Sequence, residues 1–197
     1  MPLAPIALPH AELLFDPNFL PPAEAQTLLQ ELTSRLAWKH EPIKLFGREV
    51  MQPRLTAWHG DAGASYRYSG IQLQPEPWTP ALLHLRRQVE AATGTTFNSV
   101  LLNLYRSGQD SMGWHADDEP ELGPEPIIAS VTLGATRNFR LKPRDPQHTA
   151  HGPITLPLTA GSLLLMRGPT QRYWLHALPK TARPVGHRLN LTFRLVR

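Results

Sequence analysis

From Asn98 onward the chain is a series of short apolar runs separated by Gly, Pro, Asp and Asn, and this pattern constrains the fold most. Such runs predict short β-strands, and a set of eight favours two packed sheets in a jelly roll, or double-stranded β-helix. The predicted fold class is therefore mainly β with flanking helices (α+β). We expect the strands at Val100–Arg106, Met112–Ala116, Ile127–Leu133, Asn138–Lys142, Ile154–Leu158, Ser162–Arg167, Tyr173–Leu178 and Arg188–Val196.

Two helices and a loose arm are expected before these strands. Ala23–Trp38 carries leucines at helical spacing, and Thr79-Pro80 offers an N-cap with proline at the first helical position of a second helix ending near Gly94. Met1–His10 is proline-rich without periodicity, which predicts an unstructured arm, and Glu12–Leu20 predicts a short strand.

His115 and Asp117 are the first candidates for chemistry. On an extended chain, side chains at positions i and i+2 point to the same face, so this imidazole and carboxylate would converge. A His-x-Asp pair alone is a weak signal, because such pairs also arise by chance. A distant third ligand would make it a two-histidine, one-carboxylate triad, which leaves one side of an iron open. His176, within the apolar segment 172–179, is the candidate.

The run Arg188–Arg194 alternates polar and apolar residues. Its period of two places Arg188 and Arg194 on one face of a strand. Two inward-facing arginines are costly unless an anion neutralises them, and a dicarboxylate would do so.

Composition restricts the kind of site and partner. The 197-residue chain has no cysteine, so a metal must be held by imidazole and carboxylate. Its net charge of +4 comes mostly from arginine, which suits a polyanion but also fits a GC-rich coding genome. No apolar run is long enough to span a bilayer and the start lacks the features of a secretory signal, so a cytoplasmic protein without a membrane partner is expected.

These motifs together resemble the AlkB family of Fe(II)/2-oxoglutarate dioxygenases, particularly its DNA-repair branch. The resemblance runs from about residue 44 to the C-terminus, and its parts are Asn103-x-Tyr105, His115-x-Asp117, His176 and Arg188-x5-Arg194. It implies a single dioxygenase domain over 1–197, acting as a monomer. Within it, residues 1–43 would form the arm and helix, 44–78 a nucleotide-recognition lid and 98–197 the catalytic jelly roll.

The resemblance also implies cofactors and roles for named residues. Fe(II) would be bound by His115, Asp117 and His176, with 2-oxoglutarate and O2 as cosubstrates. Arg188 would pair with the distal carboxylate of 2-oxoglutarate and Arg194 would lie near its metal-chelating end. Asn103, Tyr105 and Asn190 would complete the cosubstrate site.

Candidate substrate residues each have a plainer alternative. Tyr66 and Tyr68 could form a stacking surface for a base or simply fill a core. Phe46 resembles the aromatic finger of duplex-acting relatives, which fills the gap left by a flipped base, or it is an ordinary hairpin residue. Arg54, Arg140, Lys142 and Arg144 are either phosphate contacts or scattered solubility charges.

The acidic run after the metal ligand is the last candidate. In DNA-repair relatives this region approaches the damaged base, which is cationic when a ring nitrogen is alkylated. A carboxylate there would favour the cation over a neutral base, so Asp118, and then Glu119, are assigned to lesion selection. The alternative is a solvated acidic turn.

The resulting hypothesis is an oxidative demethylase acting on 1-methyladenine and 3-methylcytosine in single- or double-stranded DNA, with RNA as a further substrate. Formaldehyde and succinate would be released. The alternatives are a 2-oxoglutarate oxygenase that hydroxylates a protein, tRNA or small molecule, and a catalytically silent nucleic-acid-binding module.

Overall fold

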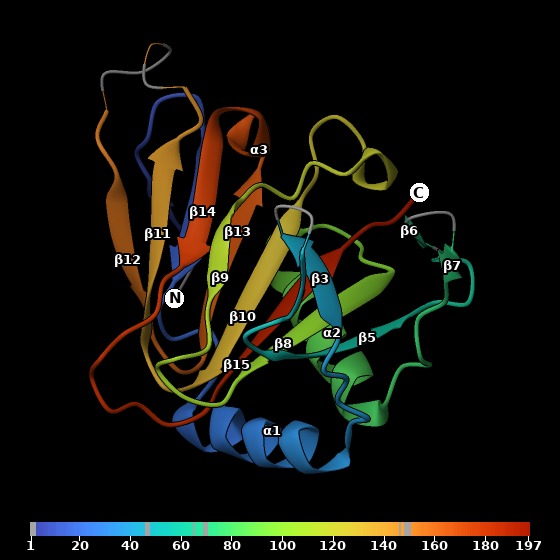
Figure 1. Ribbon diagram of the computed structural model, residues 1–197. Coiled ribbons are helices and arrows are strands. Elements are labelled where there is room, and N and C mark those ends of the chain that lie inside the picture. Colours follow the sequence, from blue (N-terminus) through green and yellow to red (C-terminus); the bar gives the residue numbers. More distant parts are fainter. Residues whose placement is uncertain (1–2, 46–47, 65, 69–70, 146, 148–150) are drawn as a thin grey trace.

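Two antiparallel sheets form the body of the protein, and helices α1 (Pro22–Arg35) and α2 (Pro80–Thr93) pack on the larger one (Figure 1). The computed structural model describes residues 3–45, 48–64, 66–68, 71–145, 147 and 151–197. The larger sheet, here called the major sheet, has the strand order β1-β2-β13-β10-β15-β8-β5, and the minor sheet has the order β12-β11-β14-β9.

The eight strands expected from Asn98 onward are present and divide equally between the sheets. In the major sheet they are β8 (Ser99–Tyr105), β10 (Ile128–Gly134), β13 (Ser162–Arg167) and β15 (Arg188–Arg194). In the minor sheet they are β9 (Met112–His115), β11 (Arg137–Pro143), β12 (Ile154–Leu158) and β14 (Trp174–Leu178). The predicted double-stranded β-helix is confirmed.

The central strands of the major sheet are buried on both faces, which explains their nearly continuous apolar sequence. In β13, Leu163 and Leu165 belong to the core beneath the helices, whereas Leu164 and Met166 belong to a second core with side chains of the minor sheet. The pocket described below opens where polar side chains replace this second core.

Both predicted helices are confirmed. The hydroxyl of Thr79 accepts a hydrogen bond from the backbone N–H of Leu82 at 3.3 Å, and Gly94 ends α2 in the left-handed region at φ 65°. Leu28 and Leu32 of α1 and Leu82, Leu85 and Val89 of α2 are buried against the major sheet.

The N-terminal prediction is wrong. Instead of a loose arm, Ala4–Ile6 forms β1, which pairs with β2 (Glu12–Asp16), and β2 in turn pairs with β13. The strand predicted to reach Leu20 therefore ends at Asp16. The proline-rich sequence is compatible with β1 because this strand is at the sheet edge, where one side of the backbone needs no hydrogen-bond partner.

The region predicted as a lid, residues 44–78, consists largely of short strands. It contains a hairpin of β3 (Pro42–Leu45) and β4 (Arg48–Met51) and a second hairpin of β6 (Tyr66–Tyr68) and β7 (Ile71–Leu73). Between them β5 (Leu55–Gly60) pairs with β8 as the edge of the major sheet.

Two short helices, η1 (Pro120–Leu122) and α3 (Thr170–Tyr173), complete the described fold. In the described part of the chain, no helix is long and apolar enough to cross a membrane.

Candidate metal centre and cosubstrate pocket

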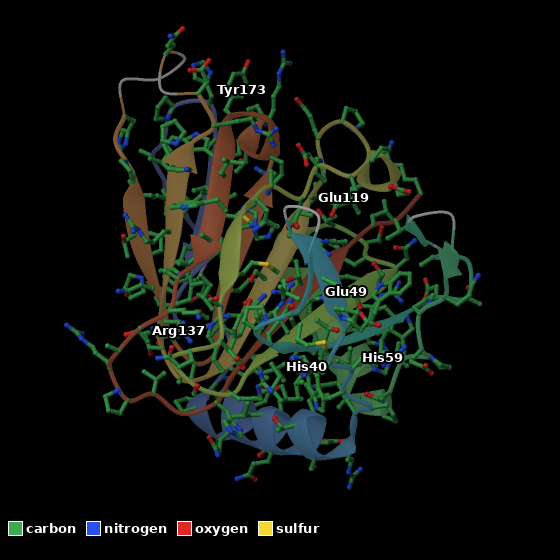
Figure 2. All side chains as sticks on the ribbon, in the orientation of Figure 1. His40, Glu49, His59, Glu119, Arg137 and Tyr173 are labelled. Carbon is green, nitrogen blue, oxygen red and sulfur yellow. The ribbon has the colours of Figure 1, made fainter. Side chains whose placement is uncertain are left out.

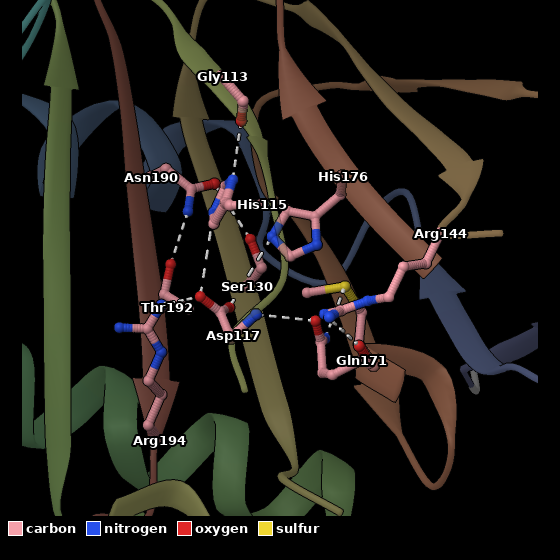
Figure 3. Close-up of polar contacts among 11 residues, drawn as sticks. Gly113, His115, Asp117, Ser130, Arg144, Gln171, His176, Asn190, Thr192 and Arg194 are labelled. Atoms are coloured by element: carbon pink, nitrogen blue, oxygen red, sulfur yellow. Dashed lines mark hydrogen bonds and ion pairs between the residues drawn. The ribbon is translucent and has the colours of Figure 1, made fainter. Parts of the chain in front are cut away.

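Three side chains converge where β9 and β14 pair, at the β9 side of the minor sheet (Figure 3). His115 ends β9, Asp117 follows it by two residues, and His176 lies on the neighbouring strand β14, where it pairs with His115. Asp117 places one carboxylate oxygen 4.0 Å from His115 Nε2 and the other 3.9 Å from His176 Nε2. One ligand atom from each residue lies within 4.8 Å of the others, which suits a single metal ion.

The two imidazoles are held in fixed orientations. His115 Nδ1 lies 2.9 Å from the carbonyl oxygen of Gly113, so Nδ1–H can donate to that oxygen and leave the Nε2 lone pair for a metal. The His176 ring meets His115 edge-on at 4.2 Å and packs against Phe139 at 5.2 Å between ring centroids. Burial lowers the pKa of His176 to about 4, which keeps this ligand neutral at physiological pH.

Asp117 is buried, yet its environment favours the carboxylate. Burial alone would raise its pKa, but the positive charge of Arg194 and the two neighbouring histidines outweigh this and hold the pKa at about 2. Arg194 donates to Asp117 Oδ1 at 2.7 Å. An ionised, preoriented carboxylate is the form that binds a divalent cation.

The polar face of β15 lines the same cavity, as its alternating sequence predicts. The cavity has a volume of about 320 Å³. All five residues predicted for cosubstrate binding line it together with the metal-binding triad: Asn103, Tyr105, Arg188, Asn190 and Arg194.

Arg188 is 2% exposed and is held by its neighbours. It donates to Thr132 Oγ1 at 3.0 Å and to Asn190 Oδ1 at 2.8 Å, and its guanidinium lies 5.3 Å from the centre of the Tyr105 ring. Burial lowers the pKa of Arg188 to about 10, so it stays cationic at neutral pH. A buried cation held by neutral partners alone is a site for an anion.

The structure places Arg54 inside the cavity. It follows the β3–β4 hairpin, and its Nε donates to Asn103 Oδ1 at 2.8 Å. Burial lowers the pKa of this guanidinium as well. Arg54 is thus positioned for the contents of the pocket more directly than for an external phosphate.

The acidic run divides between two environments. Glu119 lines the cavity and its Oε2 is buried without a hydrogen-bond partner in the described structure, while burial raises the pKa of its carboxyl group. Asp118 instead points to solvent and accepts a hydrogen bond from exposed Arg144 at 2.6 Å. Figure 2 shows Glu119 in the segment that follows β9. The lesion-selecting role predicted for this run fits the position of Glu119 better than that of Asp118.

Other predicted substrate residues lie at or beyond the limits of the described structure. Tyr66 and Tyr68 form β6, whose backbone pairs with β7, but the positions of their side chains are not described. Phe46 lies outside the described residues, between Leu45 and Arg48, which pair across the hairpin. The two strands of the hairpin predicted around Phe46-Gly47 are present as β3 and β4.

The sequence analysis missed residues that hold the site together. Gln171, 2% exposed, accepts a hydrogen bond from the backbone N–H of Asp117 at 3.0 Å (Figure 3). Ser130 lines the cavity and donates to Asn190 Oδ1 at 3.1 Å. Arg137, at the opposite end of the minor sheet from Tyr173 in Figure 2, donates to the carbonyl oxygens of Ser107, Asp110 and Pro179 and so ties the loops before β9 and after β14 together. The available sequence signal was a polar residue within or next to an apolar run.

The donor set fits Fe(II) and 2-oxoglutarate. Two imidazoles and one carboxylate match a facial triad with open positions. The buried Nε groups of Arg188 and Arg194 have no hydrogen-bond partner among the described residues, so both can still donate to an anion. His115, Asp117 and His176 would hold the metal, and the two arginines would receive the carboxylates of the keto acid.

Comparison with known proteins agrees with this geometry. Residues 12–194 match the family model of the 2OG-Fe(II) oxygenase superfamily. The chain is 43% identical over 186 residues to human alpha-ketoglutarate-dependent dioxygenase alkB homolog 3, covering 91% of this chain and 64% of that protein. It is 41% identical over 181 residues to human DNA oxidative demethylase ALKBH2, covering 88% of this chain and 69% of the relative.

The chain belongs to the AlkB family of 2OG-Fe(II) oxygenases. This family membership accounts for the order of the triad and the two arginines along the sequence. The chain spans 64% of the length of the alkB homolog 3 proteins from human and Bos taurus. The solved structure of OsALKBH1 covers 98% of the chain with a TM-score of 0.65 and 17% sequence identity, which supports the AlkB-type fold.

Proposed function

We propose that this AlkB-family chain is an Fe(II)/2-oxoglutarate-dependent dioxygenase that removes N-alkyl groups from nucleobases in DNA, with RNA as a further substrate. The single observation that carries this proposal is the convergence of the triad, the unpaired donors of Arg188 and Arg194, and the carboxylate of Glu119 on one cavity. Relatives named as a DNA oxidative demethylase, at 41% identity, support the substrate class.

The residues have distinct tasks in this reaction. When bound, Fe(II) with 2-oxoglutarate and O2 supplies the oxidation that hydroxylates the N-methyl carbon, after which formaldehyde leaves the base. His115, Asp117 and His176 would hold the metal. Arg188 and Arg194 orient the keto acid from the opposite sheet, and the apolar side chains of the cavity exclude water.

Glu119 gives the pocket its preference for a damaged base. Alkylation of a ring nitrogen in 1-methyladenine or 3-methylcytosine makes the base cationic, and a buried carboxylate attracts a cation more strongly than a neutral base. The ion pair between Asp118 and Arg144 lies outside the cavity and would shape its rim. The protein is proposed to act as a monomer in the cytoplasm.

Formaldehyde release tests the proposal. We expect the Fe(II)-loaded protein to release formaldehyde from oligonucleotides carrying 1-methyladenine or 3-methylcytosine, and to consume 2-oxoglutarate in step with it. Consumption of 2-oxoglutarate with a protein, tRNA or small molecule, without formaldehyde from methylated DNA, would favour the alternative hydroxylases. Absence of Fe(II) binding would leave only the silent nucleic-acid-binding module.

The role proposed for Phe46 has its own test. Phe46→Ala should reduce repair of methylated duplex DNA more than repair of the same single strand, because an aromatic wedge lowers the cost of unstacking only in a duplex. Leu195→Ala is the matched control, because it truncates another exposed apolar residue, directly after β15. Equal losses on both substrates would contradict the wedge.

A further inference from the structure

Trp114 is a large aromatic residue that the fold leaves exposed. It is 40% exposed and directly precedes the metal ligand His115 on β9. Because successive side chains of a strand point to opposite faces, His115 faces the cavity and Trp114 faces outward from the minor sheet. Tryptophan is enriched at binding interfaces, because its ring is apolar and its N–H can still meet a polar partner.

Two cations from another strand lie over this indole. The distances to the centre of the Trp114 ring are 4.6 Å from Lys142 Nζ and 5.8 Å from Arg140 Cζ. Strand β14 lies between β9 and β11 in the sheet, so these side chains meet above it. Ala177, which pairs with Arg140, is too short to block this contact. Trp114, Arg140 and Lys142 are here called the outer Trp patch.

The charge of the outer Trp patch is not neutralised within the described structure. Neither Arg140 nor Lys142 forms an ion pair with a carboxylate in the described ranges, whereas Arg144, two residues further on, pairs with Asp118. An aromatic face flanked by unneutralised cations matches the chemistry of a single-stranded nucleic acid, in which bases stack and phosphates carry the charge.

The position of β9 explains how one strand of nucleic acid could reach both the cavity and the patch. Among the described strands, β9 is at the edge of the minor sheet, so a chain can pass from the inner to the outer face around it. Ser111, directly before β9, also contacts the loop that follows the β3–β4 hairpin, since its N–H donates to the carbonyl oxygen of Pro53 at 2.9 Å. Val50 and Met51 of that hairpin are 40% and 49% exposed.

We propose that the outer Trp patch binds the single-stranded nucleic acid that flanks the target base. An unpaired base stacks on Trp114, and Arg140 and Lys142 contact the phosphates on either side of it. The inference rests on the proposed function for the identity of the ligand, and it assigns a second binding site, outside the catalytic cavity, on the opposite face of the same strand.

Binding of an unmodified oligonucleotide tests this site without any turnover. The probe is a fluorescein-labelled 12-nucleotide oligo-dT, titrated by anisotropy with the full chain under anaerobic conditions with Mn(II) and 2-oxoglutarate. We expect Trp114→Ala to weaken binding about 10-fold, and Trp114→Phe to retain most of the affinity because a ring remains for stacking. Lys142→Gln should reduce the slope of log affinity against log salt by about 0.7, the value for one phosphate contact on a single strand.

Arg35→Gln is the matched control for Lys142→Gln, because it removes one positive charge from the surface of α1. It should leave the salt slope unchanged. Thermal unfolding of each variant checks that it is folded. If Trp114→Ala does not fold, the site is tested with Trp114→Phe and Lys142→Gln alone. Trp114→Ala binding within two-fold of the unaltered protein, or a Trp114→Phe loss as large as that of Trp114→Ala, would overturn the stacking site.

Formaldehyde release separates the two proposals. If methylated DNA yields no formaldehyde but oligo-dT binding still depends on Trp114, the demethylase function fails and the patch stands. If formaldehyde is released and oligo-dT binding does not depend on Trp114 or Lys142, the patch fails and the function stands.

Discussion

The backbone N–H of Asp117 donates to Gln171 Oε1 at 3.0 Å, although 54 positions separate the two residues. Gln171 lies on α3, directly before the strand that carries His176. One buried amide therefore links the segment of one metal ligand to the element that leads to another. Partners of this kind fix the orientation of ligands without touching the metal.

Replacing Gln171 should consequently weaken metal binding. Gln171→Met keeps the side-chain volume but removes the acceptor, and we expect the Mn(II) affinity to fall about 10-fold, at the lower end of the effect of such partners. Isothermal titration calorimetry without cosubstrate measures it. Gln109→Met, at an exposed loop position, is the control and should bind Mn(II) as the unaltered chain does. Unchanged affinity in Gln171→Met would show that the backbone of Asp117 needs no such support.

Arg188 should be required for cosubstrate binding in a way that lysine cannot replace. Lysine keeps the charge but lacks the planar fork that contacts Thr132, Asn190 and a carboxylate together. We expect Arg188→Lys to raise the dissociation constant of 2-oxoglutarate about 30-fold, or about 2 kcal/mol. Anaerobic calorimetry with Mn(II) checks this, with exposed Arg183→Lys as the control. Equal affinity in Arg188→Lys would place the distal carboxylate elsewhere.

Asp110 should stabilise the fold only above acidic pH. It accepts hydrogen bonds from the backbone N–H and Nε of Arg106, both at 2.8 Å, in the loop between β8 and β9. Burial alone would raise the pKa of Asp110, but its bonds to Arg106 and the charge of Arg106 hold it below its usual value. A carboxyl group with a lowered folded pKa stabilises the protein above its unfolded value of about 3.9, and this contribution is lost as pH falls through the folded pKa.

Asp110→Asn should therefore lower the free energy of unfolding by about 1 kcal/mol at pH 7, a modest value because the Arg106 side chain is 42% exposed. The difference should shrink below pH 4. Urea unfolding at pH 7, 5 and 3 measures it, and Glu31→Gln, in a solvent-exposed pair on α1, should change stability by only a few tenths of a kcal/mol. A difference as large at pH 3 as at pH 7 would mean that packing, not charge, explains the loss.

Glu119, more than Asp118, should set the preference for cationic lesions. Glu119 lines the cavity, whereas the carboxylate of Asp118 is paired with Arg144. We expect Glu119→Gln to lower the ratio of kcat/KM for 1-methyladenine over neutral 3-methylthymine about 10-fold, which is about 1.4 kcal/mol. Asp118→Asn is the matched variant and should change that ratio about two-fold. The reverse ranking would return the assignment to Asp118.

Much of the fold, the metal-binding triad and the lining of the cavity could be predicted because they follow local periodicity. Arg188 and Arg194 share a face with Asn190 because a strand alternates with period two, and His115 and Asp117 converge for a related reason. The third ligand, His176, was found from its apolar surroundings, which mark a buried strand.

What the sequence could not provide depends on long-range pairing. Ala4–Ile6 is a strand only because it pairs with β2. Gln171 contacts Asp117 only because the fold brings α3 next to the segment that follows β9. Likewise, Asp118 and Glu119 are adjacent acidic residues, and they are distinguished by the cavity that Glu119 lines and by the pairing of Asp118 with Arg144.

The metal-binding triad belongs to the minor sheet and the segment after it, whereas both arginines project from β15 of the major sheet. A keto acid that chelates the metal and also contacts the arginines would therefore link the two sheets of the sandwich. Loading both together should make the layers melt as one cooperative unit at a higher temperature, by mass action on the folded state.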